Sequence, residues 1–459
     1  MEHKFKTIDC WVDEHRLLEL LSNKQHSFNL HSDFGNERLG RYSILGADPF
    51  LTFTSFKNEI VVNKKGKKIL KENTDPFTEM KLLLENYKIN INTELPFIGG
   101  AVGYFGYDNY SFLEDVSNDN IDDIKIPDAF WGFYDKVYIF DHKNKTIILS
   151  VINYDGNQDL SKNITEMLEI LTASTNKTEP DFFVASNFSG NMNKDYYIKA
   201  INKIKNYIRA GEVYQVNFTQ RFSCDFKGSY LGFYHKLKEI NPAPFSAYVD
   251  TGMGIIISSS PERYLKIRNN KIETRPIKGT ISRDQNVVAD LANKNKLYHS
   301  EKDRAELLMI VDLERNDLGR IAVDGTVKVD ELFLVESYAT VHHLVASITA
   351  EIAIDIDIID CIKNTFPGGS ITGAPKIRAM EIIEELEPTK RKAYTGTLGY
   401  IGFNNVADLN IAIRTVIINN NKAYFQVGGG VVWDSEAEAE YEESLLKGKA
   451  LRKALIGEC

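Results

Sequence analysis

Short asparagine turns between strand-like segments restrict this chain more than any other feature of its sequence. Asn269 and Asn270 separate RYLKIR from KIETRPI, and Asn419 to Asn421 join two further strand-like runs. Such turns connect neighbouring strands as hairpins. Helical patterns are mixed with these strands without a regular β-α-β alternation. We therefore predict an α+β protein: a large composite fold of antiparallel β-sheets with a β-sandwich-like core, flanked by helices.

Helices are indicated by apolar spacing and by cap residues. Tyr197 to Ile208 carries an apolar stripe at helical spacing and Gly211 follows it, as expected at a helix end. Serine with an acidic residue three positions later predicts helix starts at Ser300 and Ser435. Pro375 suits the first turn of a helix that stops before Pro388.

The chain's 459 residues are long enough for two regions. A Ser/Thr/Asn-rich passage at 172–194 predicts a linker between an N-terminal region, 1–171, and a C-terminal region, 195–456. The acidic stretch 114–123 and the basic stretch 63–71 are expected to be solvated surface.

Composition excludes several classes of protein. The net charge of −9, from 55 basic and 64 acidic residues, disfavours nucleic-acid binding. The four cysteines are far apart, which argues against a zinc site or a disulfide framework. Neither a signal-like segment nor an apolar run of membrane-spanning length occurs, so we expect a cytoplasmic protein.

Charged residues near the end of the chain form one candidate site. Glu440, Glu443 and Lys447 fall within roughly a 60° arc of one helical face. Two carboxylates and a lysine suit a divalent cation beside an anionic ligand, although this helix alone favours an exposed face stabilised by Glu–Lys pairs. The glycines Gly428, Gly429 and Gly430 immediately precede this helix and allow a ligand to approach the backbone closely, or serve packing alone.

A second candidate site lies around the Asn269–Asn270 hairpin. Glu262 precedes the hairpin and Lys278 follows it, so the two are expected at one end of a sheet, as proton donor and amine nucleophile or as a structural ion pair. Glu306 lies among apolar residues of a helix and requires either an exposed edge or a cation. His342 and His343 alternate in a strand, so at most one faces a given pocket. TFPGGSITGAPKIRAM, from Thr365, fails the phosphate-loop pattern, which excludes that form of ATP binding.

The ordered motifs together resemble the chorismate-utilising enzymes, the family of anthranilate synthase component I, aminodeoxychorismate synthase component I and the isochorismate and salicylate synthases. The stretches that carry the resemblance are AGEVYQVNFTQRF, SSSPERYL, RPIKGT, EKDRAELLMIVDLERNDLGR, HHLVASI, FPGGSITGAPKIRAMEII, AYTGTLGYIG, NIAIRT and GGGVVWDSEAEAEYEESLLKGKA. The resemblance covers nearly the whole chain and implies the anthranilate synthase component I type of fold.

Two positions discriminate between branches of the family. Anthranilate synthases typically carry alanine where this chain has Lys278, and aminodeoxychorismate synthases carry lysine. Isochorismate and salicylate synthases place a water-activating lysine at the position of Gln215. The combination seen here implies the aminodeoxychorismate synthase branch: amination of chorismate to 4-amino-4-deoxychorismate for para-aminobenzoate and folate synthesis.

The resemblance also implies roles for individual residues. Lys278 is expected to attack the ring, and Glu262 to protonate the departing hydroxyl. Mg²⁺ is expected on Glu306, Glu440 and Glu443. Substrate contacts are expected from Gly279, Thr280, His343, Ser370, Tyr394, Arg414, Gly428, Gly429, Gly430 and Lys447.

Further expectations concern an effector and a partner. Ser32, Leu39, Gly40, Arg41, Tyr42, Pro244, Phe245 and Ser246 match an aromatic amino-acid pocket of relatives, which binds tryptophan or serves only packing here. The chain has no evident glutaminase segment, so the resemblance implies ammonia from a separate glutamine amidotransferase subunit. The alternatives are an anthranilate synthase component I, which Lys278 disfavours, and a non-enzymatic aromatic ligand sensor, which the full set of carboxylates disfavours.

Overall fold

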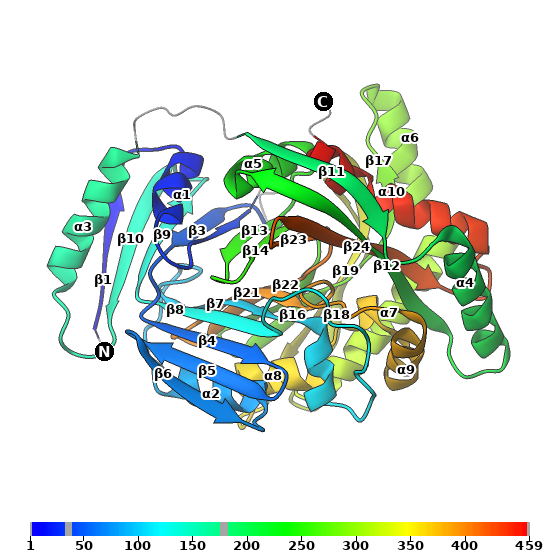
Figure 1. Cartoon of the computed structure of the whole chain (residues 1–459), viewed down its shortest axis with the longest axis horizontal. Helices are drawn as coiled ribbons and strands as arrows, with labels where there is room; N and C mark the ends of the chain where they lie inside the picture. Colours follow the sequence, from blue (N-terminus) through cyan, green and yellow to red (C-terminus); the bar gives the residue numbers. More distant parts are fainter. Residues whose placement is uncertain (1, 33–38, 175–181, 457–459) are drawn as a thin grey trace.

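The structure is a computed structural model that describes residues 2–32, 39–174 and 182–456. Two large antiparallel sheets face each other and helices cover their outer faces, as Figure 1 shows. The predicted α+β fold with a sandwich-like core is thereby confirmed.

The first sheet runs from β1 at one end to β11 at the other. Its strands, in spatial order, are β1 (Glu2–Ile8), β10 (Thr146–Asn153), β9 (Lys136–Asp141), β3 (Tyr42–Gly46), β2 (Phe28–His31), β13 (Phe245–Asp250), β14 (Ile255–Ser260), β23 (Thr415–Asn419), β24 (Lys422–Val431), β12 (Gln215–Gly228) and β11 (Phe183–Gly190), with β20 (Gly373–Ala374) beside β12.

The second sheet lies across the core from the first. Its strands, in spatial order, are β17 (Ile277–Ser282), β19 (Val341–Glu351), β16 (Lys271–Arg275), β15 (Arg263–Arg268), β22 (Val406–Ile411), β21 (Thr397–Gly402), β7 (Gly100–Phe105), β8 (Ala129–Tyr134), β4 (Leu51–Phe56), β5 (Glu59–Lys64) and β6 (Lys67–Glu72), with β18 (Lys328–Ser337) beside β19.

The helices are α1 (Glu14–Ser22), α2 (Pro76–Glu85), α3 (Leu160–Ala173), α4 (Lys194–Arg209), α5 (Tyr230–Ile240), α6 (Val287–Tyr298), α7 (Glu301–Gly319), α8 (Ile358–Thr365), α9 (Lys376–Leu386) and α10 (Ala437–Ile456), with short 3-10 turns at η1 (Tyr107–Phe112) and η2 (Gly369–Ile371). None of the helices in the described residues is long and apolar enough to cross a membrane.

Local signals in the sequence explain most helix ends. The Ser300 side chain accepts a hydrogen bond from the Asp303 amide at 3.3 Å, so the predicted cap of α7 is confirmed. The predicted cap at Ser435 is wrong, because α10 begins at Ala437 and the Ser435 hydroxyl donates to Glu440 at 2.6 Å instead. The serine therefore orients a carboxylate, and the helix starts two residues later.

The two regions expected from the sequence are interleaved in space. The N-terminal β2 pairs with β13, and β7 pairs with β21, so each sheet takes strands from both regions. The predicted linker 172–194 contains the end of α3 and the whole of β11, which corrects the view of it as connection alone. Its polar composition reflects the exposed edge position of β11.

The core between the sheets positions the ends of the strands. Phe28, Ile139 and Ile256 of the first sheet pack with Val102 and Phe130 of the second. Burial of this apolar surface holds the two sheets in one arrangement. The strand ends that carry Lys278 and the three glycines are therefore fixed relative to each other.

Candidate active site

A bulge in β17 presents Lys278. The pairing of β17 with β19 shifts register between Lys278 and Thr280. Gly279 lies inside this bulge at φ +75°, and a Cβ there would lie 2.8 Å from the Asp303 carboxyl carbon. Only glycine combines this backbone conformation with such a close approach. The glycine noted beside the lysine in RPIKGT therefore allows the strand to bulge against α7.

The amine of Lys278 lacks a direct partner. Among the described residues, none hydrogen-bonds the amine or forms an ion pair with it within 4.0 Å. Burial lowers the pKa of Lys278; Glu262 opposes this shift and the Lys447 ammonium adds to it. The environment thus favours the neutral amine, the form that acts as a nucleophile.

Glu262 lies in the short connection between β14 and β15 and is 5% exposed. Burial raises its pKa, against opposing effects of the Ser370 hydroxyl and the Lys278 amine. The shifts of the two groups are in opposite directions, so the carboxyl tends to keep its proton while the amine tends to lose one. That is the pairing that a general acid and a nucleophile need.

His343 faces the same strand as the lysine. Thr280 and His343 share a hydrogen bond of 2.8 Å between Oγ1 and Nδ1, and burial lowers the pKa of His343 to about 3. His342 instead contacts Asp290 at 3.0 Å and Ser337 at 2.8 Å. The expectation that only one histidine faces the pocket is consistent with these separate partners.

Arg414 is held in an unusual backbone conformation. Its φ of 49° lies in the left-handed region, which costs a non-glycine residue free energy and recurs at functional sites. Burial lowers the pKa of Arg414, and Glu262 opposes this shift. The guanidinium donates to Asn241 at 3.3 Å and is close enough to Glu262 to interact electrostatically with it.

Tyr394 was expected to contact substrate together with Arg414. The interactions that shift its pKa come from burial, Arg391 and Glu387. Tyr394 also contributes to raising the pKa of the buried Tyr197, whose ring contacts Tyr441 of α10. Its placement therefore links it to the Glu440 side of the site, and its contact with substrate stays a prediction.

Two of the three expected metal ligands, Glu440 and Glu443, face the glycine run. A Cβ on Gly429 would lie 3.5 Å from Glu440 Oε2 and 3.7 Å from Glu443 Oε1, and 3.0 Å from Lys447 Nζ. Lys447 pairs with Glu443 at 2.8 Å and donates to the Gly428 carbonyl at 3.1 Å. The helical face predicted from the sequence is thus turned toward the glycine run, and a Cβ at 429 would press on the Lys447 amine.

The electrostatics of these carboxylates fit a cation. Burial raises the pKa of Glu306 and of Glu440. Burial acts in the same direction on Glu443, but Lys447 outweighs it and lowers that pKa. In the part of the chain that the structure describes, the three do not close into a group with all oxygens within 4.8 Å of one another. All three side chains offer carboxylate oxygens, the ligand type that Mg²⁺ prefers. Burial of Glu306 and Glu440 without full charge compensation would favour a bound cation.

Two groups of this site were not singled out as ligands by the sequence. Glu314 is buried beside Gly369, and burial, with Asp317, raises its pKa to about 8. The Gln215 amide is buried beside Gly430, and neither its oxygen nor its nitrogen has a hydrogen-bond partner. A glutamate within the apolar side of a helix is the signal that could have marked Glu314.

The residues expected to form an aromatic amino-acid pocket also gather. Ser32 donates to the Pro244 carbonyl at 2.8 Å, and Ser246 pairs with His31 across β2 and β13. Arg41 lies over the Tyr42 ring at 4.7 Å and pairs with Asp141 at 2.8 Å. The structure thus brings both sequence segments together, and tryptophan binding stays a prediction.

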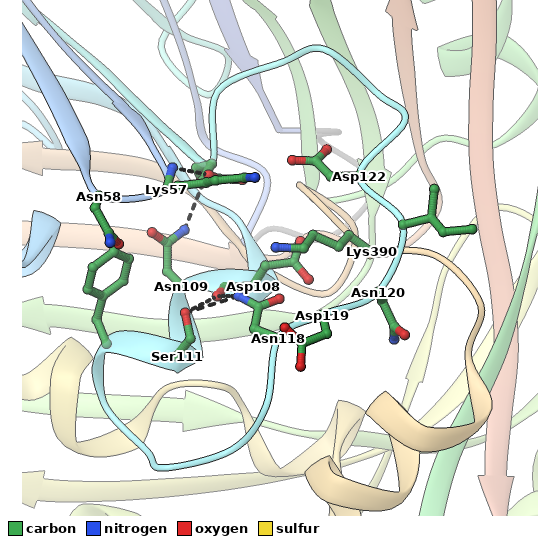
Figure 2. A pocket seen from close by; sticks show the side chains of 13 residues that line it. Lys57, Asn58, Asp108, Asn109, Ser111, Asn118, Asp119, Asn120, Asp122 and Lys390 are labelled. Carbon is green, nitrogen blue, oxygen red and sulfur yellow. Dashed lines mark hydrogen bonds between the residues drawn. The ribbon is translucent and has the colours of Figure 1, made fainter.

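A large cavity lies away from these groups. Figure 2 shows its acidic and amide side chains around Asp108, and its volume is about 580 Å³. Asn118 to Asp122 line it, so this part of the acidic stretch 114–123 borders a cavity, contrary to the expectation of solvated surface alone. None of the predicted catalytic or metal residues lines this cavity.

Comparison with known proteins shows which proteins this chain resembles over nearly its whole length. The sequence pattern of the chorismate binding enzymes matches residues 29–453. Aminodeoxychorismate synthase component 1 of Escherichia coli (strain K12) is 40% identical over 95% of this chain and 94% of that protein. Anthranilate synthase component 1 of Acetivibrio thermocellus is 37% identical over 98% and 94%. The crystal structure of anthranilate synthase component I from Streptococcus pneumoniae TIGR4 matches with a TM-score of 0.79 and 33% identity, covering 89% of this chain and 92% of that one.

Proposed function

The chain belongs to the chorismate binding enzyme family, and we propose that it acts as an aminodeoxychorismate synthase component 1. In this role it converts chorismate and ammonia to 4-amino-4-deoxychorismate, a precursor of para-aminobenzoate and folate. The observation that carries the proposal is the Lys278 amine, which is held without an ion-pair partner beside a buried carboxylic acid.

The proposed reaction has two displacement steps. In the first, the neutral Lys278 amine forms a bond to ring carbon C2, the ring double bonds shift, and the C4 hydroxyl leaves as water after Glu262 protonates it. In the second, ammonia adds at C4, the double bonds shift back, and the C2–N bond to Lys278 breaks. The C4 ammonium formed in this step gives one proton back to Glu262, and the lysine leaves C2 as the neutral amine with the electron pair of the broken C2–N bond.

Other residues of the chain bind and orient the substrate. Arg414 supplies a cation for the enolpyruvyl carboxylate, and the backbone amides at Gly428 to Gly430 supply further donors. Glu306, Glu440 and Glu443 would hold Mg²⁺, which when bound supplies positive charge for the ring carboxylate. Gln215, with its unpaired amide, offers a donor and an acceptor to the same ligand.

Ammonia is proposed to come from a glutamine amidotransferase partner. The relatives named as component 1 support the idea that this chain works with a second component. Free ammonium at high concentration should replace that partner in a test with the isolated chain.

Anthranilate synthase component 1 is the second candidate, because relatives of that name match nearly as well. Incubation with chorismate, Mg²⁺ and ammonium separates the two. We expect 4-amino-4-deoxychorismate, identified by mass spectrometry and converted to para-aminobenzoate only when a lyase is added. Fluorescent anthranilate forming without an added lyase would reject the proposal.

A further inference from the structure

A second group of titratable side chains lies far from Lys278, on the N-terminal part of the first sheet. Glu14 of α1, His31 of β2 and His142, which follows β9, place one ligand atom each within 4.8 Å of one another. Glu14 is buried and both histidine side chains are at most 21% exposed. None of these residues belongs to the catalytic site.

We propose that Glu14, His31 and His142 form a binding site for a divalent transition-metal ion of the Zn²⁺ type. Two imidazoles with one carboxylate are a donor set that Zn²⁺ prefers and that Mg²⁺ does not. The proposal goes beyond the chorismate chemistry and does not depend on it.

The distances suit such an ion. Tetrahedral zinc bonds of about 2.0–2.1 Å separate neighbouring ligand atoms by about 3.3 Å. Glu14 Oε2 lies 3.1 Å from His31 Nδ1 and 3.8 Å from His142 Nε2, which is too long for a hydrogen bond. These two separations bracket the zinc value.

The groups around the three ligands prepare them. Asn29 Nδ2 donates to Glu14 Oε1 at 2.7 Å, and Lys238 lies 3.9 Å from the same oxygen. This is the kind of outer contact that orients a ligating carboxylate. His31 Nδ1 also lies 2.8 Å from Oε1, so an ion bound at Oε2 would replace this contact between His31 and Glu14.

A buried hydroxyl supplies a fourth donor. Ser43 Oγ lies 2.7 Å from His142 Nε2 and 3.1 Å from His31 Nδ1. The hydroxyl thus lies beside both imidazole ligand atoms and would offer an oxygen to an ion that they share.

The site would brace the segments that carry the predicted aromatic amino-acid pocket. His31 is adjacent to Ser32, and Ser43 is adjacent to Tyr42. His142 follows Asp141, the ion-pair partner of Arg41. A bound ion would thus tie α1, β2, β3 and the end of β9 together, and should stabilise the fold by mass action.

The test uses the full chain, free of any affinity tag and stripped of metal, in buffer containing millimolar Mg²⁺. Titration with Co²⁺ should give one equivalent of a species with the visible absorption of four- or five-coordinate cobalt, and Zn²⁺ should displace it. Zn²⁺ should also raise the melting temperature of this protein.

Two variants locate the ion. His142→Ala and Glu14→Gln should each weaken Co²⁺ binding by at least about tenfold and abolish the Zn²⁺-dependent rise in melting temperature. His3→Ala, which changes a histidine of β1 bonded to Ser150, is the matched control and should bind as the unaltered chain does. His31→Gln serves in place of either variant if that variant fails to fold.

The proposal is overturned if Co²⁺ does not bind in a saturable manner at micromolar concentrations. It is equally overturned if folded His142→Ala and Glu14→Gln bind as tightly as the His3→Ala control. Either result would leave Glu14, His31, His142 and Ser43 as a hydrogen-bonded network only.

Discussion

Two groups of buried charge behave differently in this molecule. Arg391 and Glu387 are 1% and 2% exposed and form a bidentate pair at 2.7 and 2.9 Å. Their remaining atoms are also bonded: Thr219 donates to Glu387, and Arg391 donates to the Asn217 and Ile371 carbonyls. Every part of this pair that folding removes from water has a partner.

The charged groups around Lys278 do not have such a full set of hydrogen-bond and ion-pair partners. Its amine has no direct partner among the described residues, and its pKa is lowered by burial, while that of Glu262 is raised. A structural pair satisfies its charges, whereas a catalytic group keeps them available for a ligand. The contrast leads us to expect function where a buried charge lacks a partner, and this expectation can be tested by mutation.

The largest effect is expected at the catalytic amine. Lys278→Ala should reduce formation of 4-amino-4-deoxychorismate by at least roughly 10³-fold, because the nucleophile is lost. Lys271→Ala, an exposed lysine in β16, is the control and should retain activity. Product formation is measured by mass spectrometry. Full activity of Lys278→Ala would contradict a catalytic role for this amine.

The second-largest effect is expected on protein stability, at the Arg391–Glu387 ion pair. Arg391→Ala should lower the free energy of unfolding by about 3–5 kcal/mol, because Glu387 is left buried and unpaired. The double variant Arg391→Met with Glu387→Leu should lose less than the single one. Urea unfolding measures both. A loss of unfolding free energy below about 1 kcal/mol in Arg391→Ala would contradict a structural role for the Arg391–Glu387 pair.

A smaller effect is expected at Glu306, one of the proposed metal ligands. Glu306→Gln should raise the Mg²⁺ concentration for half-maximal activity by at least about tenfold, since a charged ligand is removed. Glu442→Gln lies on the same helix as Glu443, is 65% exposed and serves as the control. Equal Mg²⁺ dependence of the two variants would contradict a role for Glu306 in binding the ion.

The smallest effect is a stability difference that depends on pH. Folding lowers the pKa of Lys278, so its contribution to stability is fully present above the unfolded pKa and is lost as pH falls through the folded one. Lys278→Met should therefore be more stable than the unaltered chain near pH 7, with a gain that shrinks toward pH 10.5. Melting curves across this range test the sign. A gain that grows with pH would contradict it.

Local signals predicted much of the molecule. Hairpin turns indicated antiparallel sheets, and the spacing of Glu440, Glu443 and Lys447 indicated their common face. Lys278 and Glu262 were expected near each other because one hairpin joins their strands, and their mutual electrostatic influence agrees with that expectation. These predictions depend only on residues that are close in sequence, within one helix or one hairpin.

What was missed depends on contacts distant in sequence. Ser435 has the spacing of a cap, but the Glu440 carboxylate competes for its hydroxyl. Glu314 becomes part of the site only because η2 packs on α7, and a Cβ on Gly369 would lie 3.2 Å from its carboxylate. Strand β11 was hidden by its polar sequence, which an edge strand tolerates.

The central claim is that Lys278 forms a covalent bond to the substrate. The most direct measurement is intact-protein mass spectrometry with chorismate and Mg²⁺ in the absence of ammonia, followed by peptide mapping. We expect an added mass of chorismate less one water on the peptide that contains Lys278, which disappears when ammonium is added. Product formation by the unaltered chain with no such adduct under any of these conditions would contradict the account.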